Sequence, residues 1–454
     1  MFKAKKVTML IASLLVAMLV ITACGNGGGA GGGAAADAEV SGPIVVGGWP
    51  AADEAFEAII PMFNEQFPDV EVEILMSPAG DFRQLLITSF AAGSGAPDVV
   101  MLEGGWMGEL RESLALENLY DEPFDGGRFA DDFVEFRWEF AHSLDGRLAA
   151  IPWDIGPATL FYRADIFEEV GLPTDPEEVH AMMSTWEGFL SMAEAVHIPG
   201  ERWLIADAAY MFQWLFMNRD FFNERLELQL ERPGAIEALE AAIIMRENEW
   251  DAQTGSMWST EANAGFANGS IVTSTAGCWY GGFLKSWVSP DNEGNWRATR
   301  LPAGLPDSNW GGSFVAIPTQ SENKLAAWAF IEFSMTTPEA QNAMFEAVDY
   351  FPALISAWDD TEIYDWADPY FGGQRTRALW VEIASNIHPV HTTMIDGSAD
   401  GNLTNAVNSA LAEGLSAHEI MDFVYEFITS AIREEREVNI DLLRDAGLWD
   451  DSWD

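Results

Sequence analysis

Segments with strand and helix patterns alternate along the chain from Pro43 to Leu102. Apolar or alternating runs that are typical of strands lie at residues 43–49, 70–76 and 99–102. Apolar side chains at helical spacing fill the intervals, at residues 56–67 and 81–92. Pro61 is expected to kink the first of these helices. Because such alternation places helices on the faces of a mostly parallel sheet, the sequence predicts an α/β fold.

The length of the chain predicts more than one hydrophobic core. The 454 residues exceed what a single compact core usually accommodates, so two lobes or more are expected. A further strand is predicted at residues 314–317 and a helix at residues 323–335. Thr185 is a plausible N-cap for a helix, and Pro338 suits the first position of another, where its missing N–H costs nothing.

The N-terminus has the pattern of an export signal. Three lysines precede an apolar run at residues 7–21, and small residues lead to Cys24. This pattern resembles the bacterial lipobox, which implies removal of a signal peptide at residues 1–23 and acylation of the Cys24 thiol. The alternatives are an ordinary secretory signal and an N-terminal membrane helix, for which the apolar run is short. We expect an exported protein anchored by lipid to the cell membrane, on its extracellular or periplasmic side.

Residues 24–42 are rich in glycine and alanine and predict a flexible tether after the lipid anchor. The folded part of the chain is expected to begin near Pro43. With Cys24 acylated, Cys278 is the only remaining thiol, so no intrachain disulfide is expected. Cys278 lies in an apolar stretch and is expected to be buried and inert.

The charge of the chain excludes several classes of partner. The 72 acidic residues against 23 basic ones give a formal charge of −49, which repels nucleic acid backbones and anionic lipid surfaces. A hydrophobic content of 48 % is nevertheless too high for a disordered acidic chain. The expected partners are therefore neutral or cationic, and no nucleic acid is among them.

Five segments carry a resemblance to a known family, at residues 96–103, 151–173, 266–279, 311–318 and 338–341. Together and in this order, they resemble the extracellular solute-binding proteins of ABC importers, specifically the sugar-binding family that includes maltose-binding proteins. The resemblance implies two α/β lobes that close by a hinge over one ligand. Lobe 1 would comprise residues 43–152 and 311–357, and lobe 2 residues 153–310 and 358–454. It also implies a carbohydrate ligand, membrane permease subunits as partners, a monomer, and neither a cofactor nor enzymatic activity.

Ligands of open α/β sheets lie beyond the carboxyl ends of strands, so residues directly after the predicted strands are candidate contacts. Sugars need aromatic rings against their faces and carboxylates or amides around their rims. The candidates are Trp49, Glu103, Trp106, Trp153, Asp154, Tyr210, Trp279, Tyr280 and Trp310. The resemblance places Trp279 on a sugar-stacking tryptophan and Glu103 on an acidic ligand-binding position. Core packing, a hinge role for Trp153 and Asp154, and a buried helix around Tyr210 and Trp214 are the alternatives.

The sequence is also compatible with other functions. The segment at residues 401–405 offers no aromatic side chain where maltose binders place one, which disfavours a maltose-type ligand. The same scaffold could bind a polyamine or a peptide instead. A secreted glycoside hydrolase is the main enzymatic alternative, because carboxylate pairs abound. His388 and His391 lack the further ligands that a metal site needs, so no metal is expected.

Overall fold

The computed structural model describes residues 40–217 and 220–453. The predicted signal peptide, the Cys24 anchor and the tether up to residue 39 lie outside the described residues. The first strand, β1 (Gly42–Gly48), begins inside the predicted tether, and the folded unit starts at Val40. Gly42 adopts a φ of 101° there and pairs with Val70, which extends the strand past Pro43.

A five-stranded sheet has the strand order β2-β1-β3-β9-β4. Its other strands are β2 (Val70–Met76), β3 (Val99–Glu103), β4 (Ile151–Pro152) and β9 (Ser313–Ala316). β1 pairs in parallel with both β2 and β3, as the alternation of strands and helices predicts. β9 enters antiparallel to β3 and β4, because it arrives from a distant part of the chain rather than through a helical crossover.

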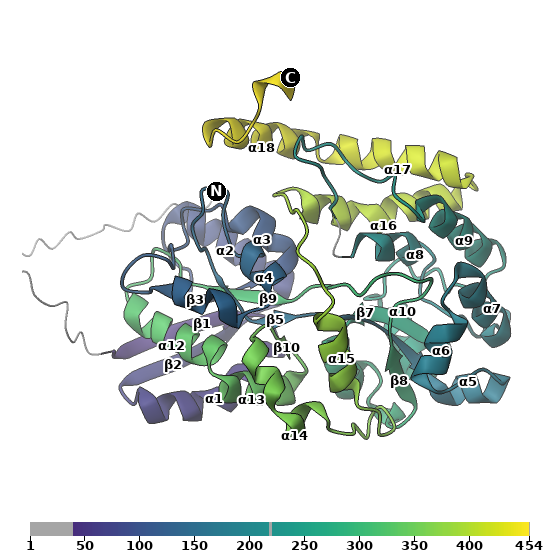
Figure 1. Ribbon diagram of the computed structural model, residues 1–454, viewed down its shortest axis with the longest axis horizontal. Coiled ribbons are helices and arrows are strands. Elements are labelled where there is room, and N and C mark those ends of the chain that lie inside the picture. The colour runs from purple at the N-terminus through teal and green to yellow at the C-terminus, as the bar shows by residue number, and fades with distance from the viewer. Residues whose placement is uncertain (1–39, 218–219, 454) are drawn as a thin grey trace, which may run out of the picture. The chain divides into compact units, whose positions relative to one another are not determined.

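Helices cover both faces of this sheet. α2 (Ala79–Ala92) and α3 (Gly104–Leu110) lie on one side in Figure 1, and α1 (Ala52–Gln66) and α13 (Pro338–Val348) lie on the other. α4 (Glu135–Phe140) and α12 (Lys324–Thr336) complete the layers. α1 runs through Pro61 without ending, and α13 begins at its proline as predicted.

A three-stranded antiparallel sheet follows the order β7-β6-β8. These strands are β6 (Ala158–Arg163), β7 (Thr273–Gly277) and β8 (Trp296–Thr299). Its antiparallel pairing differs from the mostly parallel sheet predicted from the first segments. A short antiparallel pair joins β5 (Asp154–Ile155) to β10 (Phe351–Pro352), so residues far apart in sequence meet beside the first sheet.

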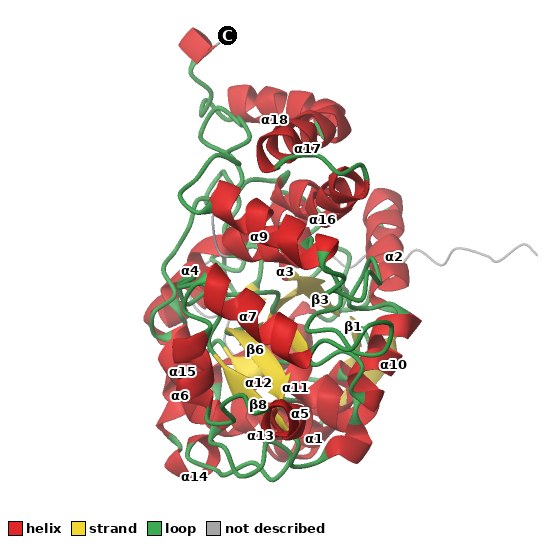
Figure 2. Ribbon diagram, turned by 90° about the vertical axis from the view of Figure 1, so that its right-hand side faces the viewer, coloured by secondary structure: helices red, strands yellow, loops and turns green. Residues whose placement is uncertain are grey.

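The helices after β5 surround the three-stranded sheet (Figure 2). They are α5 (Ala164–Val170), α6 (Pro176–Met182), α7 (Trp186–Val196), α8 (Tyr210–Gln213), α9 (Ala235–Glu247), α10 (Thr260–Asn268) and α11 (Tyr280–Phe283). The predicted cap of α7 is confirmed, since the Thr185 hydroxyl accepts a hydrogen bond from the N–H of Gly188 at 3.1 Å.

The C-terminal part is helical. It comprises α14 (Thr361–Tyr364), α15 (Thr376–Ala384), α16 (Asp396–Ala412), α17 (Ala417–Ala431) and α18 (Arg433–Asp445). A capping box between Ser416 and Glu419 fixes the start of α17. Within the described part of the chain, no helix combines the length and hydrophobicity needed to cross a membrane.

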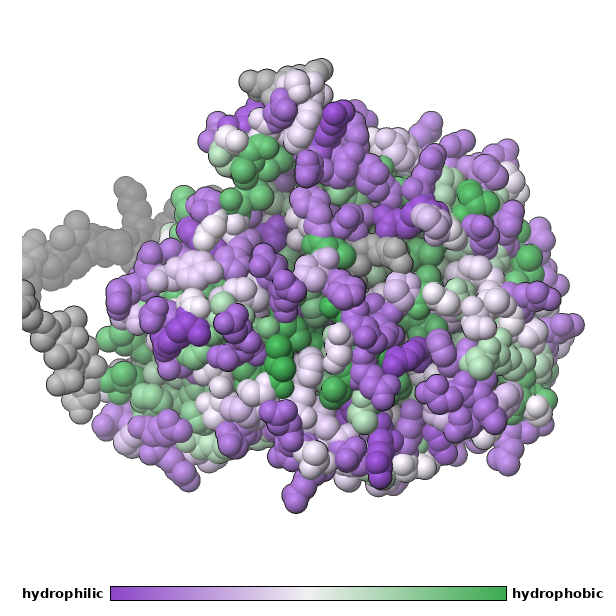
Figure 3. All heavy atoms as spheres, in the orientation of Figure 1, coloured by the Kyte–Doolittle hydropathy of each residue, from purple (hydrophilic) through white to green (hydrophobic). Residues whose placement is uncertain are grey.

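The buried hydrophobic residues form two clusters, as expected for a chain of this length. β6 contributes to both, because neighbouring strand residues face opposite sides: Phe161 joins the first cluster, and Leu160 and Tyr162 join the second. Cys278 is a free, buried thiol, as predicted, and burial raises its pKa. Hydrophilic side chains cover most of the face shown in Figure 3, while hydrophobic ones gather in its middle. The lobe boundaries stay a prediction.

Candidate functional site

A cavity of about 890 Å³ lies where the ends of strands from both sheets meet. This volume is within the range of small-molecule sites in proteins. The predicted contacts that line the cavity are Trp49, Glu103, Trp106, Asp154, Tyr210, Trp279 and Trp310. Segments from at least five separate parts of the sequence therefore contribute to one concave surface, as the position of these residues after strands predicts.

Two predicted contacts do not line this cavity. Trp153 is fully buried, and its ring stacks on Phe56 at a centroid distance of 4.8 Å. Successive side chains of an extended segment point to opposite sides, so Trp153 faces the core while Asp154 faces the cavity. Tyr280 is also fully buried, edge-on to the ring of Trp279. Trp214 is buried and stacks on Trp186, which matches the alternative of a buried helix.

Tryptophans form one wall of the cavity. The ring of Trp279 stacks on that of Trp258 at 5.8 Å with an interplanar angle of 16°, and its indole N–H donates a hydrogen bond to the Trp310 carbonyl at 2.9 Å. A Cβ at Gly277 would lie 2.2 Å from the Trp279 indole nitrogen, so only glycine permits this position. Trp279 is thus held at a fixed angle, with part of its surface still exposed to the cavity.

A second aromatic pair belongs to the five-stranded sheet. Trp49 follows β1 and Trp106 lies in α3, which follows β3 directly. Because β1 and β3 are parallel neighbours, their carboxyl ends bring the two rings together edge to face, with centroids 5.4 Å apart. The cavity is therefore lined by aromatic rings from both sheets.

Carboxylates occupy the cavity between the aromatic groups. Glu103 accepts a hydrogen bond from the N–H of Gly105 at 2.7 Å, and Asp154 accepts one from the N–H of Ser313 at 2.7 Å. Burial raises the pKa of Glu103 to about 7 and that of Asp154 to about 6. Asp400 accepts a hydrogen bond from the side-chain amide of Gln213 at 2.9 Å, and burial raises its pKa as well. These groups supply acceptors for ligand hydroxyls.

A buried guanidinium moderates this negative charge. Arg137 lies over the ring of Phe314 at 4.2 Å, and its Nη2 donates a long hydrogen bond of 3.4 Å to the Asp154 carbonyl. Its charge lowers the pKa values of Glu103 and Asp154, opposing the larger effect of burial. Burial in turn lowers the pKa of Arg137 to about 10. Arg137 thus favours the ionised form of both carboxylates.

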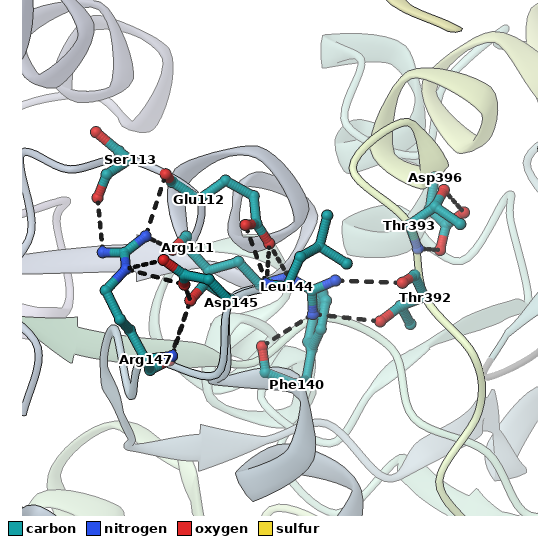
Figure 4. Close-up of polar contacts among 11 residues, drawn as sticks. Arg111, Glu112, Ser113, Phe140, Leu144, Asp145, Arg147, Thr392, Thr393 and Asp396 are labelled. Atoms are coloured by element: carbon teal, nitrogen blue, oxygen red, sulfur yellow. Dashed lines mark hydrogen bonds and ion pairs between the residues drawn. The ribbon is translucent and has the colours of Figure 1, made fainter. Parts of the chain in front are cut away.

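A smaller cavity of about 240 Å³ adjoins the first, and Glu103, Trp310 and Asp400 line both. Figure 4 shows how the outer side of this region is held together. The Arg111 guanidinium, just after α3, donates to the carbonyls of Phe140 and Thr392 at 3.2 Å each. These bonds join the end of α3 to the segment that leads into α16.

Several lining residues escape the sequence-based prediction. Trp258 belongs to a short loop segment with no strand before it. Gln213 lies in a helix whose hydrophobic sequence predicts burial. Residues 401–405 are the segment that lacks an aromatic side chain, and Thr404 and Asn405 bring polar groups into the cavity instead, together with Asp400 directly before the segment. Among the residues that the structure describes, no group of three or more potential metal ligands occurs.

Comparison with known proteins defines the class of this chain. The sequence model of the family described as bacterial extracellular solute-binding protein matches residues 58–369. The chain therefore belongs to the bacterial extracellular solute-binding proteins, and the resemblance to solute-binding proteins of ABC importers is confirmed.

Relatives of known name lie within this class. The chain is 23% identical over 385 residues to the arabinooligosaccharide-binding protein of Halalkalibacterium halodurans. The aligned region covers 79% of this chain and 82% of that protein. It is 24% identical over 395 residues to the lactose-binding protein of Rhizobium radiobacter, and this alignment covers 79% of this chain and 85% of that protein.

Solved structures share the fold. A binding protein of B. animalis subsp. lactis in complex with beta-1,6-galactobiose has a TM-score of 0.71 at 20% identity, with 88% of this chain and 98% of that one covered. Maltose-bound MalE3 of T. maritima has a TM-score of 0.68 at 21% identity, and the superposition covers 85% of this chain and 99% of that one. The predicted α/β fold class with two lobes is thus confirmed.

Proposed function

We propose that this protein captures an extracellular carbohydrate in the larger cavity and delivers it to the permease subunits of an ABC importer. The observation that carries the proposal is the combination of exposed indole surface and carboxylates in one cavity, with Trp279 beside Glu103 and Asp154. Indole faces cover the C–H surfaces of a pyranose, and carboxylates accept its hydroxyls. The names of the arabinooligosaccharide- and lactose-binding relatives support the same class of ligand.

The proposed mechanism is hinge closure. The cavity is lined by residues from the five-stranded sheet, such as Glu103, and from the three-stranded sheet, such as Trp279. A ligand that contacts both groups favours the closed conformation by its higher affinity for that conformation. A closed, loaded monomer then meets the permease subunits. A lipid anchor at Cys24 would keep it near the membrane, on the outer side.

Calorimetric titration tests the proposal with a defined panel. The panel contains arabino-, malto- and galacto-oligosaccharides of two to six units, lactose, and the polyamine spermidine. At least one saccharide should bind, and the saccharide should be recovered unchanged. Binding of spermidine alone would contradict the carbohydrate assignment. Release of new reducing ends from any saccharide would show a glycoside hydrolase and contradict the role as a binding protein.

A further inference from the structure

Two tryptophans near the cavity expose an unusual amount of their surface. Trp258 lines the cavity and is 45% exposed, and Trp287 lies beyond it and is 52% exposed. Large aromatic side chains are normally mostly buried, so a pair that stays in water beside a ligand cavity calls for an explanation. The folded chain gains no core packing from these exposed ring faces.

Trp287 continues a row of rings that begins inside the cavity. Trp279, Phe283 and Trp287 are spaced four residues apart on a helical segment formed by α11 and a π-helical turn at Leu284–Val288. The ring centroids of Trp279 and Phe283 are 5.6 Å apart, and those of Phe283 and Trp287 are 5.7 Å apart. Trp279 and Phe283 line the cavity, while Trp287 does not. The row therefore leads from the cavity to the protein surface.

The opposite side of this helical segment is firmly anchored. Lys285 forms ion pairs with Asp349 at 2.5 Å and with Asp368 at 2.7 Å. A Cβ at Gly282 would lie 2.6 Å from the Val348 carbonyl, which shows how closely the segment approaches the end of α13. The rings thus project from a backbone that is fixed from behind, so stacking on them loses little conformational freedom.

We propose that Phe283 and Trp287 form an outer subsite for further sugar units of an oligosaccharide whose first units occupy the cavity. This inference rests on the proposed carbohydrate function. A sugar chain is the occupant because the row is continuous with the cavity, and because successive rings can each cover the C–H face of one sugar unit. The row continues outward from Phe283 by one further ring, since the centroid of Trp287 lies 5.7 Å from that of Phe283, and this places Trp287 where a sugar unit beyond the cavity would lie.

Trp287→Ala tests the outer subsite with oligosaccharides of increasing length. The probe is the series of two to six units that binds the wild-type protein in the calorimetric panel. We expect the variant to bind the disaccharide as the wild type does, and to bind the longest members about tenfold more weakly. Trp287→Phe should restore most of this loss. Tyr425→Ala is the control, because Tyr425 on α17 is a 44% exposed aromatic side chain that does not line the cavity.

Each outcome has a distinct meaning. An affinity of Trp287→Ala equal to that of the wild type at every length overturns the subsite, as does a loss that is the same at every length. If the affinity of the wild-type protein does not increase with saccharide length beyond the disaccharide, the subsite is also overturned, but the proposed function is not. Failure of the wild type to bind any saccharide of the panel overturns both.

Discussion

Replacement of Trp279 by alanine is the substitution for which the structure gives the clearest expectation. The indole lines the cavity, stacks on Trp258 and donates a hydrogen bond to Trp310, so it is the ring most firmly held in place for a ligand. A sugar face that covers about 100 Å² of apolar surface at ~25 cal/mol/Å² gains about 2.5 kcal/mol. Loss of this free energy in Trp279→Ala should raise the dissociation constant about 50- to 100-fold.

Isothermal titration with the tightest saccharide of the panel measures this loss. Thermal unfolding without ligand gives the stability of the variant, and Tyr425→Ala on α17 controls for removal of an exposed aromatic side chain elsewhere. Trp279→Phe should retain part of the affinity, because a ring remains while the hydrogen bond to Trp310 is lost. An unchanged dissociation constant for Trp279→Ala would refute the stacking role and place the ring among the packing residues.

Three further predictions concern charge and packing. Because the pKa of Glu103 is raised to about 7 and sugar hydroxyls favour the ionised carboxylate, saccharide binding should weaken as the pH falls from 8 to 6; Glu103→Gln should show a smaller dependence, confined to the region near pH 6 where Asp154, with a pKa of about 6, takes up a proton, and a dependence equal to that of the wild type would contradict this role of Glu103. Lys285→Met leaves Asp349 and Asp368 without their lysine and should lower the free energy of unfolding by about 2–3 kcal/mol, measured by urea denaturation; an unchanged midpoint would contradict the pairing. Gly277→Ala should displace the Trp279 indole and weaken saccharide binding, with circular dichroism expected to show a retained fold; wild-type affinity would contradict the need for glycine.

The local sequence predicts the parallel strands of the first sheet and the part of the cavity that lies at their ends. Strand and helix patterns between residues 43 and 102 place Trp49, Glu103 and Trp106 at the ends of neighbouring parallel strands, and the structure brings these residues together. The prediction succeeds because parallel strands joined by helices end at the same edge of a sheet, so order along the chain fixes proximity in space.

The local hydrophobic pattern could not predict how strands far apart in the sequence pair with one another. β9 joins the first sheet antiparallel from a distant part of the chain, and the three-stranded sheet is antiparallel throughout. Adjacent residues also differ in direction: Asp154 reaches the cavity whereas Trp153 packs on Phe56. The position of a residue after a strand predicts that it lies near the site. Which of two adjacent residues, such as Trp153 and Asp154, faces the ligand depends on how the strand pairs with strands that come later in the sequence.

Distant segments supply the remaining part of the cavity. Arg137 approaches Glu103 and Asp154 only through the packing of α4, and Asp400 reaches the cavity only because α16 packs against α3. A Cβ at Gly397 would lie 2.4 Å from the Gly105 carbonyl, so this approach depends on two backbones meeting directly. No local periodicity encodes such a contact.

A crystal structure of the protein with the tightest-binding saccharide of the panel would show directly whether the cavity holds a carbohydrate. One sugar ring should lie against the indole of Trp279, with its hydroxyls donating to Glu103 and to Asp154 or Asp400. A saccharide bound outside the cavity, or inside it without contact to Trp279 and these carboxylates, would rule out the proposed binding site.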